Sequence, residues 1–280
     1  MQFFADNVVY SSYLYIFAVY KSKKIDIMKQ KILLILMLLL PLSSLAQKEA
    51  YAVFKDSTLT FYYNDKRPEG AYGVENLVED TSTNAHINNP SAWFVDKVYN
   101  KEWFMVSNQI KTVVFDNSFK EYRPINCSRW FYICKNLTSI IGMKENLNTS
   151  EVIDMSYMFY YCKNLTSLDV SSFNTEHVFA MNSMFAECFR LTSLDLSGFN
   201  TENVIDMTSM FAFCEDVKTI YVGDGWNTSN VLRLKVMFFS CSNLVGEQGT
   251  KYNFINFEDD ASYAHIDCGE SNPGYLTKKN

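Results

Sequence analysis

Residues 158–236 contain three nearly identical segments: MFYYCKNLTSLDVSSFNTEHVFAMNS from Met158, MFAECFRLTSLDLSGFNTENVIDMTS from Met184 and MFAFCEDVKTIYVGDGWNTSNVLRLKV from Met210. The first two segments have 26 residues each and the third has 27. A fixed period of this size is typical of proteins that stack one supersecondary unit on the next, because a single unit cannot bury its apolar face alone. We therefore expect the rest of the chain to begin, close or export such a stack.

Two hydrophobic periods alternate inside each segment. Leu194 and Leu196 alternate with polar neighbours, which predicts a short strand with one buried face. Further along, apolar residues recur at offsets of three, four and three, which predicts a short helical or 3₁₀ segment. Across the junction of the second and third segments these residues are Val204, Met207, Phe211 and Cys214.

The predicted fold is therefore a β-rich α/β solenoid, a parallel stack of about five coils, each a strand plus a short helix, with a cap at either end. Neighbouring strands would lie about 4.8 Å apart. Asp154 and Asp206 precede the helix-spaced residues and are expected to cap the short helices. The residues expected in the repeat core are Cys162, Cys188, Cys214, Leu168, Leu194, Met184, Met210, Phe185, Phe211, Asn174 and Asn200.

The repeat also resembles a known family. The run L-T-S-L-D-[LV]-S-x-F-N-T, followed by V-x-x-M-x-x-M-F-x-x-C, is similar to the BspA-like leucine-rich-repeat surface proteins of Bacteroidetes and relatives. The resemblance extends over 110–280, since N-P-G-Y-L-T at 272–277 is also similar to that family. It implies a leucine-rich-repeat fold and a surface-exposed or secreted binding protein, not an enzyme. The family has no single conserved activity, so the resemblance assigns no catalytic residue.

Residues 28–46 predict a secretory signal peptide. Lys29 and Lys31 form a basic start, 32–40 is an unbroken apolar run, and small residues lead to Ala46, after which cleavage is expected. The apolar run is too short for a membrane anchor, which needs about 20 residues. We interpret 1–27 as a mis-called N-terminal extension, with translation beginning at Met28.

The mature chain is predicted to have three parts: an N-terminal β-hairpin and cap region at 47–109, the repeat stack at 110–245 and a C-terminal cap at 246–280. The runs 51–54 and 59–63 predict the hairpin. Residues 93–105 are expected to cover the first edge of the stack, because exposed strand edges invite unwanted pairing.

Charge excludes some classes of partner. After removal of 1–46 the chain has 20 basic and 29 acidic residues, a net charge of −9. It also has no cluster of Lys and Arg, which argues against binding to nucleic acid or anionic lipid.

Five cysteines occupy one repeat position and are expected to form a column of buried thiols, with isolated disulfides as the alternative. They are Cys134, Cys162, Cys188, Cys214 and Cys241. Because C-x-x-C is absent and the three His are scattered, no metal and no cofactor are expected.

The outward face of the strands is the candidate binding surface. Ser193 and Thr219 belong to a row of small hydroxylated residues, and Asp169, Asp195 and Tyr221 belong to a second row that varies from segment to segment. Tyr221 is the best single anchor, because Tyr offers a large contact area with a polar tip. The alternative is that both rows only contact solvent. No His or Arg accompanies the two Asp, so catalysis is not expected.

The favoured function is a secreted or cell-surface binding protein, in adhesion or in recognition of a host or neighbouring-cell protein or glycan. One alternative is a secreted carbohydrate-active or hydrolytic protein with its activity in 47–109. Another is a purely structural surface component.

Overall fold

The computed structural model describes residues 47–74, 106–256 and 260–279. The extension 1–27, the signal peptide 28–46 and the cap segment 93–105 lie outside these residues. All elements described below belong to the unit Lys48–Asn280.

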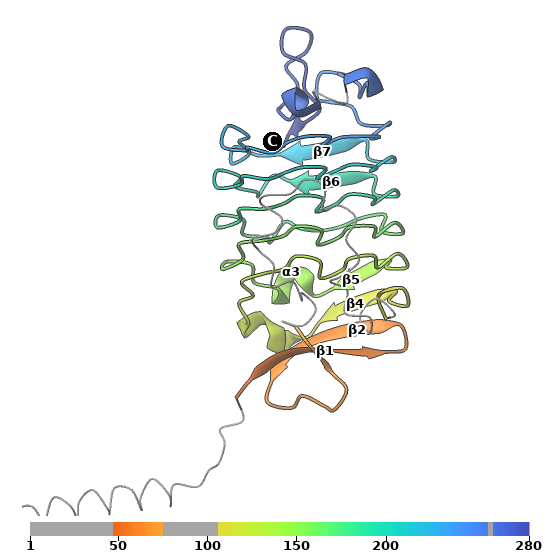
Figure 1. Cartoon of the computed structure of the whole chain (residues 1–280), viewed down its shortest axis with the longest axis vertical. Coiled ribbons are helices and arrows are strands. Elements are labelled where there is room, and N and C mark those ends of the chain that lie inside the picture. Colours follow the sequence, from red (N-terminus) through yellow and green to blue (C-terminus); the bar gives the residue numbers. More distant parts are fainter. Residues whose placement is uncertain (1–46, 75–105, 257–259, 280) are drawn as a thin grey trace, which may run out of the picture. The chain divides into compact units, whose positions relative to one another are not determined.

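The strands form two separate sheets (Figure 1). The larger has the order β3-β1-β2-β4-β5. In it β1 and β2 pair as an antiparallel hairpin, and β2, β4 and β5 pair in parallel. The smaller sheet is parallel and has the order β6-β7-β8. The bounds are β1 Glu49–Lys55, β2 Thr58–Asn64, β3 Tyr72–Gly73, β4 Thr112–Phe115, β5 Ser139–Ile141, β6 Ser193–Leu196, β7 Thr219–Val222 and β8 Thr277–Lys278.

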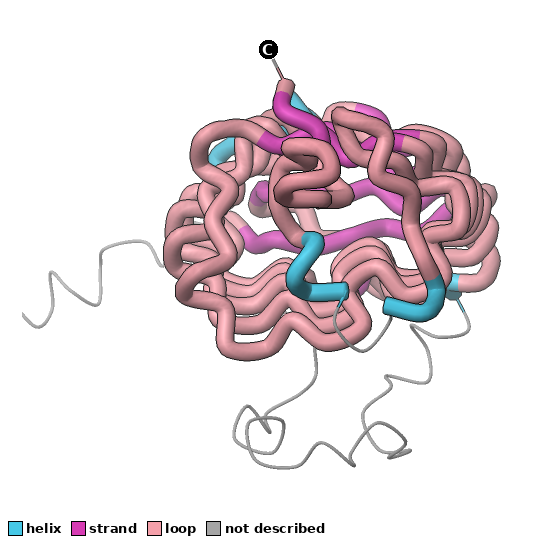
Figure 2. The backbone as a smooth tube through the Cα atoms, turned by 90° about the horizontal axis from the view of Figure 1, so that it is seen from above, coloured by secondary structure: helices cyan, strands magenta, loops and turns pink. Residues whose placement is uncertain are grey.

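Helices are almost absent from the described residues, and most of the backbone between the strands is turn and loop (Figure 2). Within the described residues the α-helical segments are α3, Met143–Asn146, and the two residues Val106 and Ser107. The 3₁₀ helices there are η3 Asn117–Glu121, η4 Phe254–Asn256 and η5 Asp260–Tyr263. The predicted solenoid of strand-plus-helix coils with a leucine-rich-repeat fold is therefore wrong: the repeats contain no helix, and their strands do not form one continuous sheet.

The sheets are separated at 167–170, where the repeat has no strand. This interruption follows α3, which is inserted after β5. Gly142, before α3, has a left-handed φ of 73°, and a Cβ at this position would lie 2.6 Å from the Phe115 carbonyl oxygen. Only glycine fits such a close approach without movement of the neighbouring backbone.

The helix-like spacing has a different cause, namely two consecutive four-residue turns in each repeat. In one repeat the Met184 N–H donates to the Met181 carbonyl at 3.2 Å, and the Cys188 N–H donates to the Phe185 carbonyl at 3.2 Å. These bonds span three residues, whereas an α-helix would span four. The first and fourth residues of both turns are fully buried. Two successive turns therefore give the offsets of three and four that predicted a helix.

The third residue of each turn has a left-handed backbone, as in a type II turn. In the same repeat these residues are Ser183 and Glu187, with φ of 54° and 60°. This conformation costs a non-glycine residue about 1–2 kcal/mol. It recurs at the equivalent residues of the other repeats: Arg129, Ile133, Tyr157, Tyr161, Ser209, Phe213, Val236 and Ser240.

Hydrogen bonds between successive layers hold these turns in place. The Phe185 N–H donates to the Met210 carbonyl at 3.0 Å, and the Glu187 N–H donates to the Ala212 carbonyl at 2.8 Å. Equivalent bonds link the layers before and after, so the repeats lie one above another (Figure 1). Because a turn that changed conformation would break bonds to its neighbours, the stack offsets the local backbone strain.

Stacked phenylalanines fill the centre of the layers. The ring centroids of Phe159 and Phe185 lie 5.9 Å apart, with planes 3° apart, and Phe185 and Phe211 repeat this geometry at 5.9 Å and 1°. Phe61 at one end and Tyr275 at the other are also fully buried. The ends of the aromatic column are therefore covered.

Buried threonines connect the corners of the layers. The Thr175 hydroxyl donates to the Asn200 carbonyl at 2.9 Å and accepts the Asn200 N–H at 2.9 Å. Thr149 and Thr201 make the same pair of bonds to the following layer. The side chain of the Asn before each Thr acts within its own layer, as when Asn174 Oδ1 accepts the Glu176 N–H at 2.9 Å. The Thr side chains thus make inter-layer bonds at the corners, and Asn203 adds another by donating to the Glu176 carbonyl at 2.8 Å.

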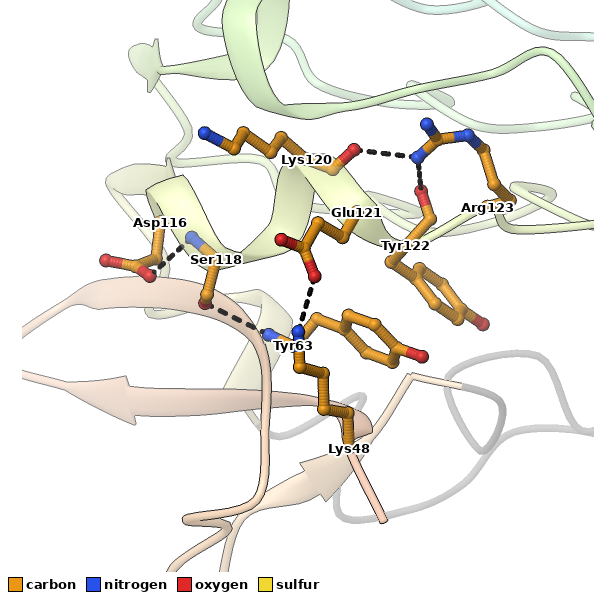
Figure 3. Close-up of polar contacts among 8 residues, drawn as sticks. All are labelled: Lys48, Tyr63, Asp116, Ser118, Lys120, Glu121, Tyr122 and Arg123. Carbon is orange, nitrogen blue, oxygen red and sulfur yellow. Dashed lines mark hydrogen bonds and ion pairs between the residues drawn. The ribbon is translucent and has the colours of Figure 1, made fainter.

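The N-terminal hairpin is attached to η3 by polar contacts (Figure 3). The Tyr63 N–H in β2 donates to Ser118 Oγ at 3.2 Å, and Lys48 forms an ion pair with Glu121. Asp116 caps η3 by accepting the Ser118 N–H at 2.9 Å. The expected hairpin runs 51–54 and 59–63 lie in β1 and β2.

At the C-terminal end, the buried Asp267 carboxylate gathers several donors. It accepts the Gln248 N–H at 2.8 Å, the Thr250 N–H at 3.0 Å and the Gly269 N–H at 2.9 Å. Burial raises the pKa of Asp267, but the bonds from Thr250, Gly269 and Gly274 outweigh it and hold the pKa at about 2. The carboxylate therefore joins the segments 248–250 and 267–274.

We predict that Thr201→Val destabilises the protein by about 1–3 kcal/mol, because the Asn227 N–H loses its acceptor inside the stack. Val has a similar volume, so the lost hydrogen bond dominates the change. Denaturant unfolding measures the effect, and Thr192→Val at an exposed site is the matched control. A loss no larger than that of the control would contradict the role of the threonines.

We predict that Asp267 makes the free energy of unfolding depend on pH in the acid range. Its folded pKa is below the unfolded value, so its contribution is complete above pH ~4 and is lost as the pH falls through ~2. Urea unfolding of the wild type and Asp267→Asn from neutral pH down to pH ~2 tests this. The variant should be less stable near neutral pH and should lose less stability on acidification. Equal pH slopes would show that Asp267 does not carry the effect.

Candidate functional site

The structure brings the predicted binding residues of β6 and β7 together. Ser193 lies opposite Thr219, and Asp195 lies opposite Tyr221, in the parallel register. Asp169 lies in 167–170, which has no strand. Ser193 is exposed, whereas Thr219 and Tyr221 are half-buried.

Both carboxylates on this face already have partners. Asp195 forms an ion pair with Lys279 and accepts the Ser197 N–H at 3.1 Å. Asp169 lies 3.7 Å from Lys144 Nζ and accepts the Ser171 N–H at 3.0 Å. These carboxylates therefore stabilise turns and bind cationic side chains of the same chain.

The pKa values of the two carboxyl groups agree with this role. Hydrogen bonds from Ser171 lower the pKa of Asp169. Burial raises the pKa of Asp195, but bonds from Lys279 and Ser197 outweigh it, so the net direction is downward. Both groups are anions near neutral pH, so neither is suited to act as a general acid there.

The structure places most of the expected core residues in the interior. Leu168 and Asn200 are half-buried and Asn174 is exposed. The buried ones are Cys162, Cys188, Cys214, Leu194, Met184, Met210, Phe185 and Phe211.

All seven cysteines are free, and the five at the repeat position are buried. The Cys188 thiol donates to the Phe159 carbonyl at 3.2 Å, and the Cys214 thiol donates to the Phe185 carbonyl at 3.1 Å. Burial raises the pKa of Cys188 and raises that of Cys214 to about 12. These thiols are therefore protonated and unreactive at neutral pH.

The described residues contain no group of three or more His, Cys, Asp or Glu side chains that could hold a metal ion. None of the helices in 47–74, 106–256 and 260–279 has the length and apolar character required to cross a membrane.

A shallow hollow of about 300 Å³ lies at one corner of the stack. It contains the carboxylates Glu202 and Asp224, with Gly198 and Gly225 in its wall. Asn200 and Asn227 also line it, but their side chains already accept N–H groups of their own turns. The hollow therefore lacks the converging polar groups of a preformed ligand site.

A surface feature that the sequence analysis missed is a column of exposed apolar side chains, one from each of five layers. We call it the apolar column. Backbone hydrogen bonds of 2.9–3.0 Å join each member to the next. Its side chains are between 42% and 83% exposed. The members are Ile125, Ile153, Phe179, Ile205 and Leu232.

The column had a signal in the sequence. In V-I-D-M at 152–155, Val152 and Met155 are buried, and Ile153 between them is exposed. The same order recurs with Phe179 and Ile205. The sequence therefore has an apolar residue at the same outward position in every repeat. The prediction of a helix did not indicate that this position faces outward.

The fold thus defines a layered protein of strands and consecutive turns. A family model described as "Mycoplasma protein of unknown function, DUF285" matches residues 125–252. No curated protein and no solved structure matches the chain. The expected relationship to BspA-like leucine-rich-repeat surface proteins is corrected by this match, since the family model that matches has another description.

We predict that a thiol reagent modifies one cysteine per native molecule at neutral pH. Cys268 is exposed, whereas the other six thiols are buried. Titration with an aromatic disulfide reagent measures the number, and all seven should react in denaturant. Cys268→Ser should remove the fast reaction from the native protein. Rapid reaction of further thiols in that variant would contradict the burial of the other six cysteines.

Proposed function

We propose that this protein is an exported binding protein that recognises a protein partner through the apolar column. Export is proposed from the signal-like sequence at 28–46. The observation that supports binding is the column itself, because contiguous exposed apolar side chains often mark interaction sites. Adhesion to a host or neighbouring cell is one use of such a protein.

The column is better suited to a partner than the strand face is. Asp169 and Asp195 would have to exchange Lys144 and Lys279 for a ligand. Burial of exposed apolar side chains, in contrast, is favourable by about 25 cal/mol per Å². Tyr221 lies beside Asp195 and is a secondary anchor at most.

A protein partner is favoured over a glycan for a chemical reason. The members of the column are three Ile, one Leu and one Phe. Aliphatic side chains offer no hydrogen bonds to sugar hydroxyl groups, whereas they pack well against the apolar side chains of a protein. The binding energy would come mainly from a few central side chains.

The hydrolase alternative gains no support from the described part of 47–109. Glu49 in β1 pairs with Arg67 at 3.1 Å, and Lys48 pairs with Glu121. A catalytic pair would require carboxylates facing a common substrate. The observed carboxylates instead attach the hairpin to neighbouring segments.

We predict that Phe179→Ser combined with Ile205→Ser weakens binding on arrays of extracellular proteins about tenfold or more, because these are central members of the column. Both side chains are about half exposed, so the fold should survive, and circular dichroism checks this. Ile255→Ser is the control, since Ile255 is 83% exposed and lies outside the column. If the double variant binds as well as the control, the column is not the binding surface.

A further inference from the structure

Acidic side chains flank the middle of the apolar column. Each lies in the sequence within three residues of Ile153, Phe179 or Ile205. Glu151, Glu176 and Glu202 are exposed, and Asp154 and Asp206 are half-buried.

Glu151, Glu176 and Glu202 form no ion pair within the part of the chain that the structure describes. Arg233 lies 3.4 Å from Asp206. At the end of the column, Arg123 donates to the backbone carbonyls of Lys120 at 2.7 Å and Tyr122 at 3.1 Å (Figure 3). His177 is exposed beside Phe179. The central layers therefore present an apolar ridge with negative borders.

The backbone N–H and C=O groups of the inner column members are already bonded to the neighbouring layers. The Phe179 N–H donates to the Ile153 carbonyl, and the Phe179 carbonyl accepts the Ile205 N–H, both at 2.9 Å. A partner therefore cannot add itself as another strand along the column, as in β-augmentation. It has to bind through side chains.

The spacing of the column favours a helix. Successive layers are about 4.8 Å apart, so five members extend over about 19 Å. Residues on one face of a strand recur every ~6.7 Å, whereas a helix advances 5.4 Å per turn. A helix of about 13 residues has the required length, and its apolar stripe can follow the ridge.

From these observations we infer that the apolar column binds an amphipathic helix whose apolar stripe is bordered by Lys or Arg. This deepens the proposed function and rests on it. The apolar stripe covers Ile153, Phe179 and Ile205, and the basic borders face the carboxylates. The same carboxylates disfavour an anionic membrane surface as the occupant.

Synthetic peptides of about 14 residues test the inference. One has a Leu stripe with Lys borders, a second replaces Lys with Glu, and a third scrambles the first. Fluorescence anisotropy with the purified protein should show the basic peptide binding about tenfold or more tightly than the other two, and less tightly at high salt. Absence of binding by the basic peptide overturns the inference.

Variants separate specific binding from general attraction to an acidic protein. Glu176→Lys with Glu202→Lys should remove the preference for the basic peptide. Phe179→Ser with Ile205→Ser should weaken the basic peptide about tenfold, and Ile255→Ser should not. Equal binding of the basic peptide to both Ser variants overturns the inference.

Three further outcomes distinguish the failure of the inference from that of the proposed function. In one outcome, the basic and acidic peptides bind equally well, and both lose binding in Phe179→Ser with Ile205→Ser. This overturns the preference for a basic helix but leaves the apolar column as a binding surface. Binding to vesicles of anionic phospholipid that depends on Phe179 and Ile205 also overturns it and assigns a membrane to the column. If binding to the protein array is unchanged in Phe179→Ser with Ile205→Ser, the proposed function itself is refuted.

Discussion

The backbone hydrogen bond between layers is the interaction on which the rest of the structure depends. Each repeat supplies two turns whose third residue is left-handed, although the sequence places Ile, Tyr and Val there. In an isolated peptide this would be unfavourable. In the stack, bonds such as Phe185 N–H to the Met210 carbonyl fix the turns on both sides. The same inter-layer bonds therefore offset the backbone strain of the turns and hold successive layers in register.

The surface follows from this arrangement. Because the backbone N–H and C=O groups of the layers hydrogen-bond to each other, a partner has to contact the outward side chains. Equivalent positions come into register, so a property kept at one repeat position becomes a continuous column. Ile153, Phe179 and Ile205 form such a column, with Glu176 and Glu202 at its border. The proposed partner, a basic amphipathic helix, matches this pattern in spacing and charge.

The sequence predicted the layers better than their local structure. The period and the alternation at Leu194 and Leu196 identified repeated units and a strand. The step from Met207 to Phe211 to Cys214 could not separate a helix from two turns, since both bury residues three and four apart. Nothing in the sequence indicated that Asp195 would bind Lys279, because these residues are far apart along the chain. The family resemblance shared this error, since it rested on the same repeat motif.

The most direct test of the layered turns is a through-hydrogen-bond scalar coupling between backbone ¹⁵N and ¹³C′ nuclei, measured by NMR on deuterated protein. The account predicts that the Phe185 amide couples to the Met210 carbonyl and the Phe211 amide to the Met237 carbonyl. A helical repeat would instead couple the Phe185 amide to the carbonyl four residues earlier, at Met181. Observation of that local coupling, without the coupling between layers, would contradict the structure described for these repeats.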